Sequence, residues 1–128
     1  HLRGGETIVV VDDEELVRNA VARVLSRAGL RVLTAVDAVE ALRLVEGHTG
    51  AIHLVLSDVV LPLASGLHLE EKLRQLRPGL PVLLMSGHLD HHAVRDALTA
   101  RACGVLQKPF TAQTLLEAVN AALAPPPS

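Results

Sequence analysis

Three carboxylate side chains stand where two apolar runs of the chain end. Asp12 and Asp13 follow the first apolar run, Thr7–Val11, and Asp58 follows the third, which ends at Ser57. If these runs are strands of one parallel sheet, their carboxyl ends share an edge and the three acids lie close together. Adjacent carboxylates repel one another unless a cation lies between them, and hard oxygen ligands favour Mg²⁺. The pattern therefore predicts a divalent cation site.

Two side chains at the ends of later apolar runs would complete a site for a phosphoryl group. Ser86 ends the fourth run and Lys108 follows the fifth. A carboxylate oxygen of Asp58 can attack phosphorus as a nucleophile, Lys108 and a metal ion can offset charge on the transferring oxygens, and Ser86 can donate a hydrogen bond to one of them. These residue types predict phosphoryl transfer onto Asp58.

The acidic residues also have a simpler interpretation. Aspartate is a common helix cap, so Asp12 or Asp13 could serve only to cap the helix that follows the first apolar run. Capping requires neither a hydroxyl nor a lysine at other strand ends. The coincidence of these groups at four strand ends favours the chemical site over capping alone.

Other residues with reactive side chains carry weaker signals. His88, His91 and His92 could suggest zinc, but no cysteine accompanies them and the polarity of a helix start explains them. Cys103 is a single cysteine in an apolar stretch, so we expect a packed thiol rather than a disulfide or a reactive group.

The elements that must position the site are predicted from hydrophobic periodicity. Short apolar and β-branched runs predict strands, and the segments between them have helical spacing. Asp37 with Glu40, and Thr111, are expected to cap helices, while Gly29 is expected to end the first one. The strands are predicted at residues 7–11, 31–35, 53–57, 81–86 and 104–107, and the helices at 15–28, 38–46, 66–75, 91–100 and 112–123.

The order of these elements predicts the fold class. Runs such as 8–11 are apolar on successive residues, which is typical of strands covered by helices on both faces. Alternating strands and helices with right-handed crossovers predict an α/β fold, a (βα)₅ flavodoxin-like three-layer sandwich around a parallel five-stranded sheet. The domain is expected to span residues 7–123, with 1–6 as linker or added residues and 124–128 as a proline-rich tail or linker.

Charge and hydropathy exclude several classes of function. The chain has 12 Lys+Arg against 14 Asp+Glu, so it lacks the basic field that would hold a nucleic-acid backbone. Its apolar runs fall far short of the roughly 20 residues that span a bilayer, and no signal-peptide pattern precedes them. We expect a cytoplasmic domain without direct contact to nucleic acid or membrane; attachment of a parent protein to a membrane stays open.

Several ordered motifs resemble the response regulator receiver domains of two-component systems. They are Val10-Val-Asp-Asp-Glu14, Asp58-Val-Val-Leu-Pro-Leu-Ala-Ser-Gly66, Met85-Ser-Gly87 and Lys108-Pro-Phe110. The resemblance covers residues 7–123 and implies the strand order 2-1-3-4-5. The opening segment Gly4-Gly-Glu-Thr-Ile8 and the motif Met85-Ser-Gly87 are similar to those of receivers at the carboxyl end of hybrid sensor histidine kinases. A stand-alone regulator or one with an output domain shares these features.

The resemblance implies a role for each acidic residue. Asp58 would be the phosphoacceptor. Asp13 and Asp58, with the backbone carbonyl of Val60, would bind Mg²⁺ directly, and Asp12 would reach the ion through water. The phosphoryl donor would be a phosphohistidine on a histidine kinase or a histidine phosphotransfer domain, and whether the domain forms a homodimer stays open.

The resemblance also assigns the remaining site residues. Ser86 takes the position of the switch hydroxyl, and Lys108 that of the lysine that contacts the phosphate. The peptide bond between Lys108 and Pro109 is expected to be cis. Such a domain catalyses its own phosphorylation and dephosphorylation and is not a turnover enzyme.

Four positions depart from the commoner pattern of the family. Val105 stands where an aromatic switch residue is common, Ser86 replaces threonine, Leu61 replaces methionine, and Val60 is apolar. Because no ring can swing inward at Val105, coupling is expected to rely on Ser86 and the loop after it. The apolar Val60 beside Asp58 predicts a long-lived phosphoryl group, since it cannot orient an attacking water.

Three other classes of function compete with this interpretation. A phosphatase of the haloacid dehalogenase type also uses a nucleophilic aspartate, but it would carry D-x-D after a strand, and here the first strand ends in Asp-Asp-Glu. A flavodoxin-like cofactor binder would carry a glycine-rich loop there. An interaction module that keeps the fold without phosphorylation remains as the second interpretation.

Overall fold

The computed structural model describes residues 4–61, 66–87 and 104–123. The predicted helix at 91–100, the three histidines after Ser86 and Cys103 lie outside these residues. The described elements are β1 (Thr7–Val11), α1 (Glu15–Arg27), β2 (Arg31–Ala35), α2 (Ala38–Gly47), β3 (Leu54–Asp58), α3 (Gly66–Leu76), β4 (Val82–Ser86), β5 (Gly104–Gln107) and α5 (Ala112–Leu123).

The five strands form one parallel sheet with the order β2-β1-β3-β4-β5, which confirms the expected fold and strand order. Every residue of β1, β3 and β4 is buried, as the continuous apolar runs predict for strands covered on both faces. Because all strands are parallel, their carboxyl ends meet at a single edge of the sheet.

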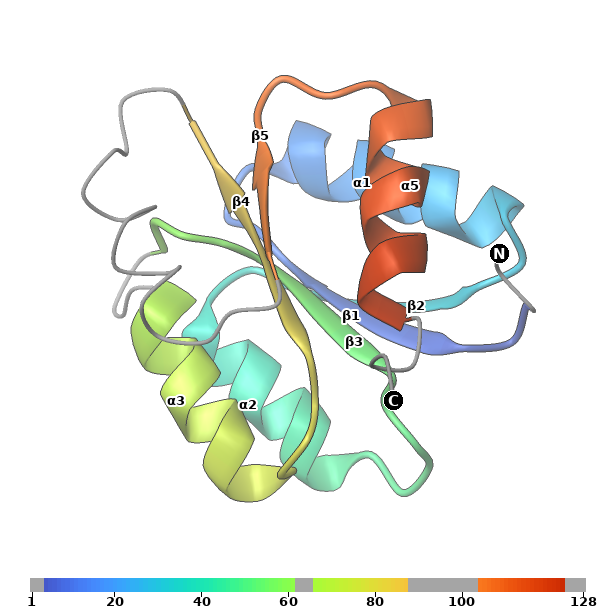
Figure 1. The fold of residues 1–128 in the computed structure, drawn as a ribbon. Helices are drawn as coiled ribbons and strands as arrows, with labels where there is room; N and C mark the ends of the chain where they lie inside the picture. Colours follow the sequence, from blue (N-terminus) through green and yellow to red (C-terminus); the bar gives the residue numbers. More distant parts are fainter. Residues whose placement is uncertain (1–3, 62–65, 88–103, 124–128) are drawn as a thin grey trace.

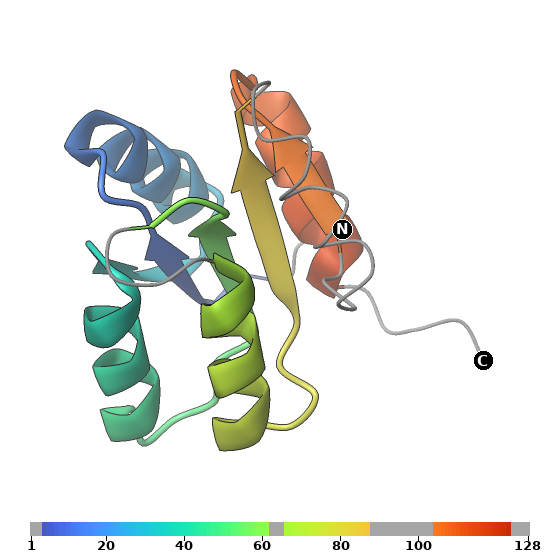
Figure 2. The ribbon, with the colours of Figure 1, turned by 90° about the vertical axis from the view of Figure 1, so that its left-hand side faces the viewer.

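The helices cover the sheet in two layers. α1 and α5 lie side by side on one face, and α2 and α3 on the other (Figures 1 and 2). Alternate residues of β1 point to opposite faces, so Val9 and Val11 join one apolar cluster while Ile8 and Val10 join the other. Among the described residues, no helix combines the length and apolarity needed to cross a membrane.

In the parts of the chain that the structure describes, the predicted caps and element ends agree with the structure to within one residue. The side chain of Asp37 accepts a hydrogen bond from the Glu40 N–H at 2.8 Å, and the Thr111 hydroxyl accepts one from the Thr114 N–H at 3.0 Å. Gly29 follows α1 with a φ of +91°. The main difference is that β3 begins at Leu54 and includes Asp58, which places this carboxylate within the sheet rather than after it.

Candidate functional site

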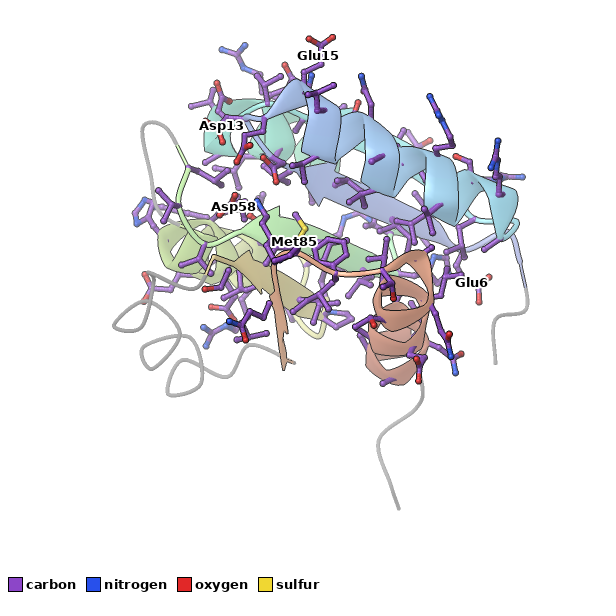
Figure 3. All side chains as sticks on the ribbon, turned by 90° about the horizontal axis from the view of Figure 1, so that it is seen from above. Glu6, Asp13, Glu15, Asp58 and Met85 are labelled. Carbon is purple, nitrogen blue, oxygen red and sulfur yellow. The ribbon has the colours of Figure 1, made fainter. Side chains whose placement is uncertain are left out.

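Asp58 is the last residue of β3, and both of its carboxylate oxygens accept hydrogen bonds. It lies opposite Met85 of β4 in the sheet register and is only 7% exposed. Its Oδ1 atom accepts a hydrogen bond from the Val60 N–H at 2.9 Å, and its Oδ2 atom accepts one from Lys108 Nζ at 2.7 Å. Figure 3 shows Asp58 and Asp13 toward one end of the sheet and Glu6 toward the other.

Asp12 is fully buried at the end of β1, and its two carboxylate oxygens have different partners. Oδ1 accepts a hydrogen bond from the Glu14 N–H at 2.8 Å, and Oδ2 accepts one from Lys108 Nζ at 3.0 Å. Glu14 is the residue that precedes the first turn of α1, and its own side chain makes no capping bond. Capping alone therefore does not explain Asp12, because one oxygen faces the lysine of another strand end.

Lys108 links the two buried aspartates. Its Nζ atom lies 2.7 Å from Asp58, 3.0 Å from Asp12 and 3.9 Å from Glu14 Oε1. Its backbone N–H donates to the Ser86 carbonyl at 2.8 Å, and its bond to Pro109 is cis, as expected. One ammonium group thus connects the ends of β1, β3 and β5.

The electrostatics of this cluster follow from burial and from its charge balance. Burial raises the pKa of Asp58, and hydrogen bonds from Lys108 and the Val60 N–H only partly offset this effect. Burial also disfavours the charged form of Lys108, but hydrogen bonds to Asp58 and Asp12 outweigh it, so the pKa of Lys108 lies above its usual value. The aspartates stabilise the ammonium, yet the ammonium does not fully offset the effect of burial on Asp58.

The donor set fits a hard divalent cation. Asp12, Glu14 and Asp58 each offer an oxygen atom, and the three atoms lie within 4.8 Å of one another. Three carboxylates against one ammonium leave excess negative charge, and oxygen ligands with an exposed side suit Mg²⁺. Asp13 is exposed at the corner between β1 and α1 and is not among these three residues, although the sequence interpretation counts it as a ligand.

Ser86, Val60 and Val105 differ in burial and in the elements that carry them. Ser86 is buried at the end of β4, and its hydroxyl donates to the Gly87 carbonyl at 3.0 Å. Val60 is 57% exposed, while Val105 is partly buried against the apolar cluster under α2 and α3. The loop after Gly87, to which the sequence assigns part of the coupling, lies outside the described residues.

Two residues near the site were not expected from the sequence. Glu14 joins the carboxylate cluster, and Arg18 Nη1 donates a hydrogen bond to the Asp12 carbonyl at 2.9 Å. Arg18 resembles any polar residue on a solvated helix face. The sequence did contain one signal for Arg18. A cation in the first turn of a helix is unfavourable next to the positive end of the helix dipole, so Arg18 could have been expected to pair with an anion or a carbonyl.

A hollow opens beside the lysine on the outer side of the site. It is lined by apolar residues of α1 together with Lys108 and Phe110. Leu16, in the first turn of α1, is part of this lining and is 85% exposed. An exposed leucine beside a charged site is a suitable contact for another protein.

Comparison with known proteins gives a consistent result. A family model described as "Response regulator receiver domain" matches residues 8–120. The chain is 34% identical over 119 residues to the sensor kinase CckA of Brucella abortus (strain 2308), which covers 93% of this chain and 13% of that protein. It is 40% identical over 119 residues to the transcriptional activator protein ExaE of Pseudomonas putida, which covers 91% of this chain and 55% of that protein.

Solved structures agree with the sequence relatives. A response regulator receiver domain protein from Clostridium thermocellum superposes with a TM-score of 0.86 at 31% identity, covering 92% of this chain and 94% of that chain. The receiver domain of NtrX from Brucella abortus gives a TM-score of 0.84 at 35% identity, covering 91% and 97%. The chain thus matches whole receiver domains but only part of the two curated relatives, CckA and ExaE.

Proposed function

Because this chain belongs to the response regulator receiver domain family of two-component signalling, we propose that Asp58 is its phosphoacceptor and that phosphorylation makes it a switch or relay. The observation that carries the proposal is the position of Lys108 Nζ, at 2.7 Å from Asp58 and 3.0 Å from Asp12. This arrangement presents a buried nucleophilic oxygen beside a cation that can receive a phosphoryl oxygen.

Each side chain has a distinct part in the proposed transfer. A carboxylate oxygen of Asp58 attacks phosphorus while the bond from phosphorus to the donor breaks, so that the imidazole of a phosphohistidine, or acetate from acetyl phosphate, leaves. The Val60 N–H holds the other oxygen of Asp58 in place. Lys108 exchanges its contact with Asp58 for one with the incoming group, and Ser86 turns its hydroxyl from the Gly87 carbonyl toward a phosphoryl oxygen. The transfer thus replaces existing hydrogen bonds of the site with bonds to the phosphoryl group.

The acidic residues would hold the magnesium ion. The carboxylates of Asp13 and Asp58 and the carbonyl of Val60 would bind it directly, and Asp12 would bind it through water. Glu14 lies close enough to Asp12 and Asp58 to add a further carboxylate. When bound, Mg²⁺ would supply positive charge that offsets the charge on the transferring oxygens.

The donor would be a phosphohistidine on a histidine kinase or a histidine phosphotransfer domain. The apolar hollow beside Lys108 supports a protein donor, because it lies next to the site and its lining includes Leu16, which is 85% exposed. Docking against α1 would place a phosphohistidine near the carboxyl ends of β1 and β3. Acetyl phosphate, a small donor, needs no such surface.

Replacing Leu16 by glutamate is expected to separate these two donors. The change places a charge in the apolar hollow, so transfer from a phosphorylated histidine phosphotransfer domain that is active on the parent should fall about tenfold or more. Phosphorylation by acetyl phosphate should stay close to that of the parent. Leu76→Glu is the matched control, because Leu76 is an exposed leucine at the end of α3, on the other face. Equal transfer to both variants would contradict donor docking at this hollow.

Replacing Val60 by asparagine is expected to shorten the lifetime of the phosphorylated domain. Val60 is exposed beside Asp58 and cannot hydrogen-bond a water molecule, whereas an amide can orient one for attack. Loss of the phosphoryl group, followed by intact mass after removal of the donor, should accelerate about tenfold or more. Val60→Ala keeps an apolar side chain and should behave like the parent. Rapid loss from the parent itself would count against the role given to Val60.

A further inference from the structure

Asp12 is a junction at which every polar atom is engaged. Its N–H donates to the Ala35 carbonyl at 3.1 Å, and its two carboxylate oxygens accept from the Glu14 N–H and from Lys108. The remaining polar atom, the backbone carbonyl, accepts from Arg18 Nη1 at 2.9 Å. Of these partners, only Arg18 reaches the junction with a side chain from the body of a helix.

The contact fixes the peptide plane between Asp12 and Asp13. A peptide group is planar, so holding its carbonyl oxygen also fixes the direction in which the next residue leaves. Arg18 is itself anchored, since its N–H donates to the Glu14 carbonyl at 2.9 Å in the first turn of α1. The guanidinium group therefore ties the corner that carries both aspartates to the frame of the helix.

The electrostatic surroundings of the Arg18 guanidinium do not by themselves favour a cation. The amino end of α1 carries a partial positive charge, and Lys108 lies on the other side of Asp12. The general electrostatic field of the helix end therefore does not account for the contact. The carbonyl of Asp12 is the one partner that the structure shows for the Arg18 guanidinium among the described residues.

We propose that Arg18 is a positioning residue for the metal and phosphoryl site, acting through the Asp12 carbonyl rather than by touching the reacting atoms. This inference rests on the proposed function of Asp58. Arg18 holds the corner that carries Asp12 and Asp13, at which the Asp12 carboxylate already faces the other strand ends through its bond with Lys108. Preformed ligands lose less conformational freedom on binding an ion, so Arg18 raises the affinity for Mg²⁺.

The sign of the effect distinguishes positioning from charge. Arg18 is a cation close to an acidic site, so by charge alone its removal reduces repulsion and tightens the binding of Mg²⁺. If Arg18 positions the ligands, its removal instead weakens the binding of Mg²⁺. Without the hydrogen bond from Arg18 the corner between Asp12 and Asp13 is less ordered, and part of the binding free energy must be used to order it. Arg18→Met removes both the charge and the hydrogen bond to the Asp12 carbonyl while keeping a long side chain with high helix propensity.

The experiment measures the dissociation constant for Mg²⁺ by calorimetric titration of the parent chain, Arg18→Met and Arg18→Lys, well below the unfolding temperature of each. We expect Arg18→Met to bind Mg²⁺ about tenfold more weakly, the size typical of lost outer contacts to metal ligands, and Arg18→Lys to recover part of the affinity. Arg23→Met is the control, since Arg23 is exposed on α1 and should leave the constant unchanged. Equal or tighter binding by Arg18→Met would overturn the proposal.

A second readout separates positioning from a structural role. If Arg18 only stabilises α1, Arg18→Met lowers the unfolding temperature and leaves the Mg²⁺ dissociation constant unchanged, which overturns the inference. If Arg18 positions the ligands, phosphorylation by acetyl phosphate is slow at low Mg²⁺ and approaches the parent rate as Mg²⁺ saturates. A parent chain that neither binds Mg²⁺ nor gains a phosphoryl group would overturn the proposed function and this inference together. A normal parent with an unchanged Arg18→Met overturns only the inference.

Discussion

Replacing Asp58 by asparagine is expected to abolish the gain of a phosphoryl group from acetyl phosphate and Mg²⁺. The parent chain should gain one phosphoryl group, because Asp58 presents a carboxylate oxygen held beside the ammonium of Lys108. An amide at the same position keeps the size of the side chain and the acceptor for the Val60 N–H, but it cannot form the acyl phosphate. Intact mass of both proteins, incubated in parallel, measures the result directly.

Each pattern of masses has a different meaning. A gain in the parent alone identifies Asp58 as the acceptor. A gain in both proteins would place the acceptor at another residue. No gain in either protein would indicate a strict requirement for a phosphohistidine donor, or a domain that keeps the receiver fold as an interaction module. Continuous release of phosphate from small esters would instead revive the phosphatase interpretation.

The same variant provides its own test of folding. Burial raises the pKa of Asp58, so the folded protein disfavours its ionised form relative to the unfolded chain. In the absence of Mg²⁺, this ionised group therefore costs stability as the pH rises above the usual aspartate value of 3.8. Metal-free Asp58→Asn should be at least as stable as the parent at neutral pH. The advantage should disappear in acid, where Asp58 is protonated in both states.

Replacing Lys108 by methionine is expected to damage both catalysis and stability. The variant leaves Asp58 and Asp12 facing each other without the ammonium that lies within 3.0 Å of both. Phosphorylation by acetyl phosphate should slow by about 100-fold, the usual cost of removing one charged group that stabilises a transition state. The free energy of unfolding of the metal-free domain should fall by about 1–3 kcal/mol at neutral pH, less than for a fully buried pair because Lys108 is 17% exposed.

Magnesium and a second lysine serve as controls for Lys108→Met. Added Mg²⁺ should restore part of the lost stability, because it supplies positive charge to the same carboxylates. Lys72→Met is the matched substitution, since Lys72 is exposed on α3, and it should leave rate and stability unchanged. Unfolding in denaturant and intact mass against time measure the two effects. Parent-like values for Lys108→Met in both assays would contradict the central role of this lysine.

The sequence predicted the fold well because each local signal agreed with the others. Continuous apolar runs such as Ile8–Val11 indicated strands covered on both faces, and the caps at Asp37 and Thr111 marked helix starts that the structure confirms. Parallel strands bring their carboxyl ends to one edge, so the sequence alone was enough to group Asp12, Asp58 and Lys108. The topology of the sheet alone predicts that these three side chains lie together.

What could not be predicted depends on turn geometry and on the reach of long side chains. Glu14 approaches Asp58 because the corner after β1 folds back, with Asp12 bonded to the Glu14 N–H. Arg18 reaches the Asp12 carbonyl from the first turn of α1. Neither contact follows from hydrophobic periodicity. Periodicity predicts which face of a helix or strand is buried, but it does not predict which group a long polar side chain contacts. Sequence can therefore group residues by strand end but cannot choose among adjacent acids.

The division of the core into two apolar clusters by the sheet bears on how such a domain can diverge. Leu115 and Val119 of α5 pack on one face, whereas Leu69 and Leu73 of α3 pack on the other, and the backbone of the sheet separates them. Substitutions on opposite faces share no contacts, so one face can accumulate mutations without requiring compensation on the other. Residues on the α1 and α5 face beside Lys108 can therefore change, so that this face binds a different partner protein, while the packing of the α2 and α3 face stays the same.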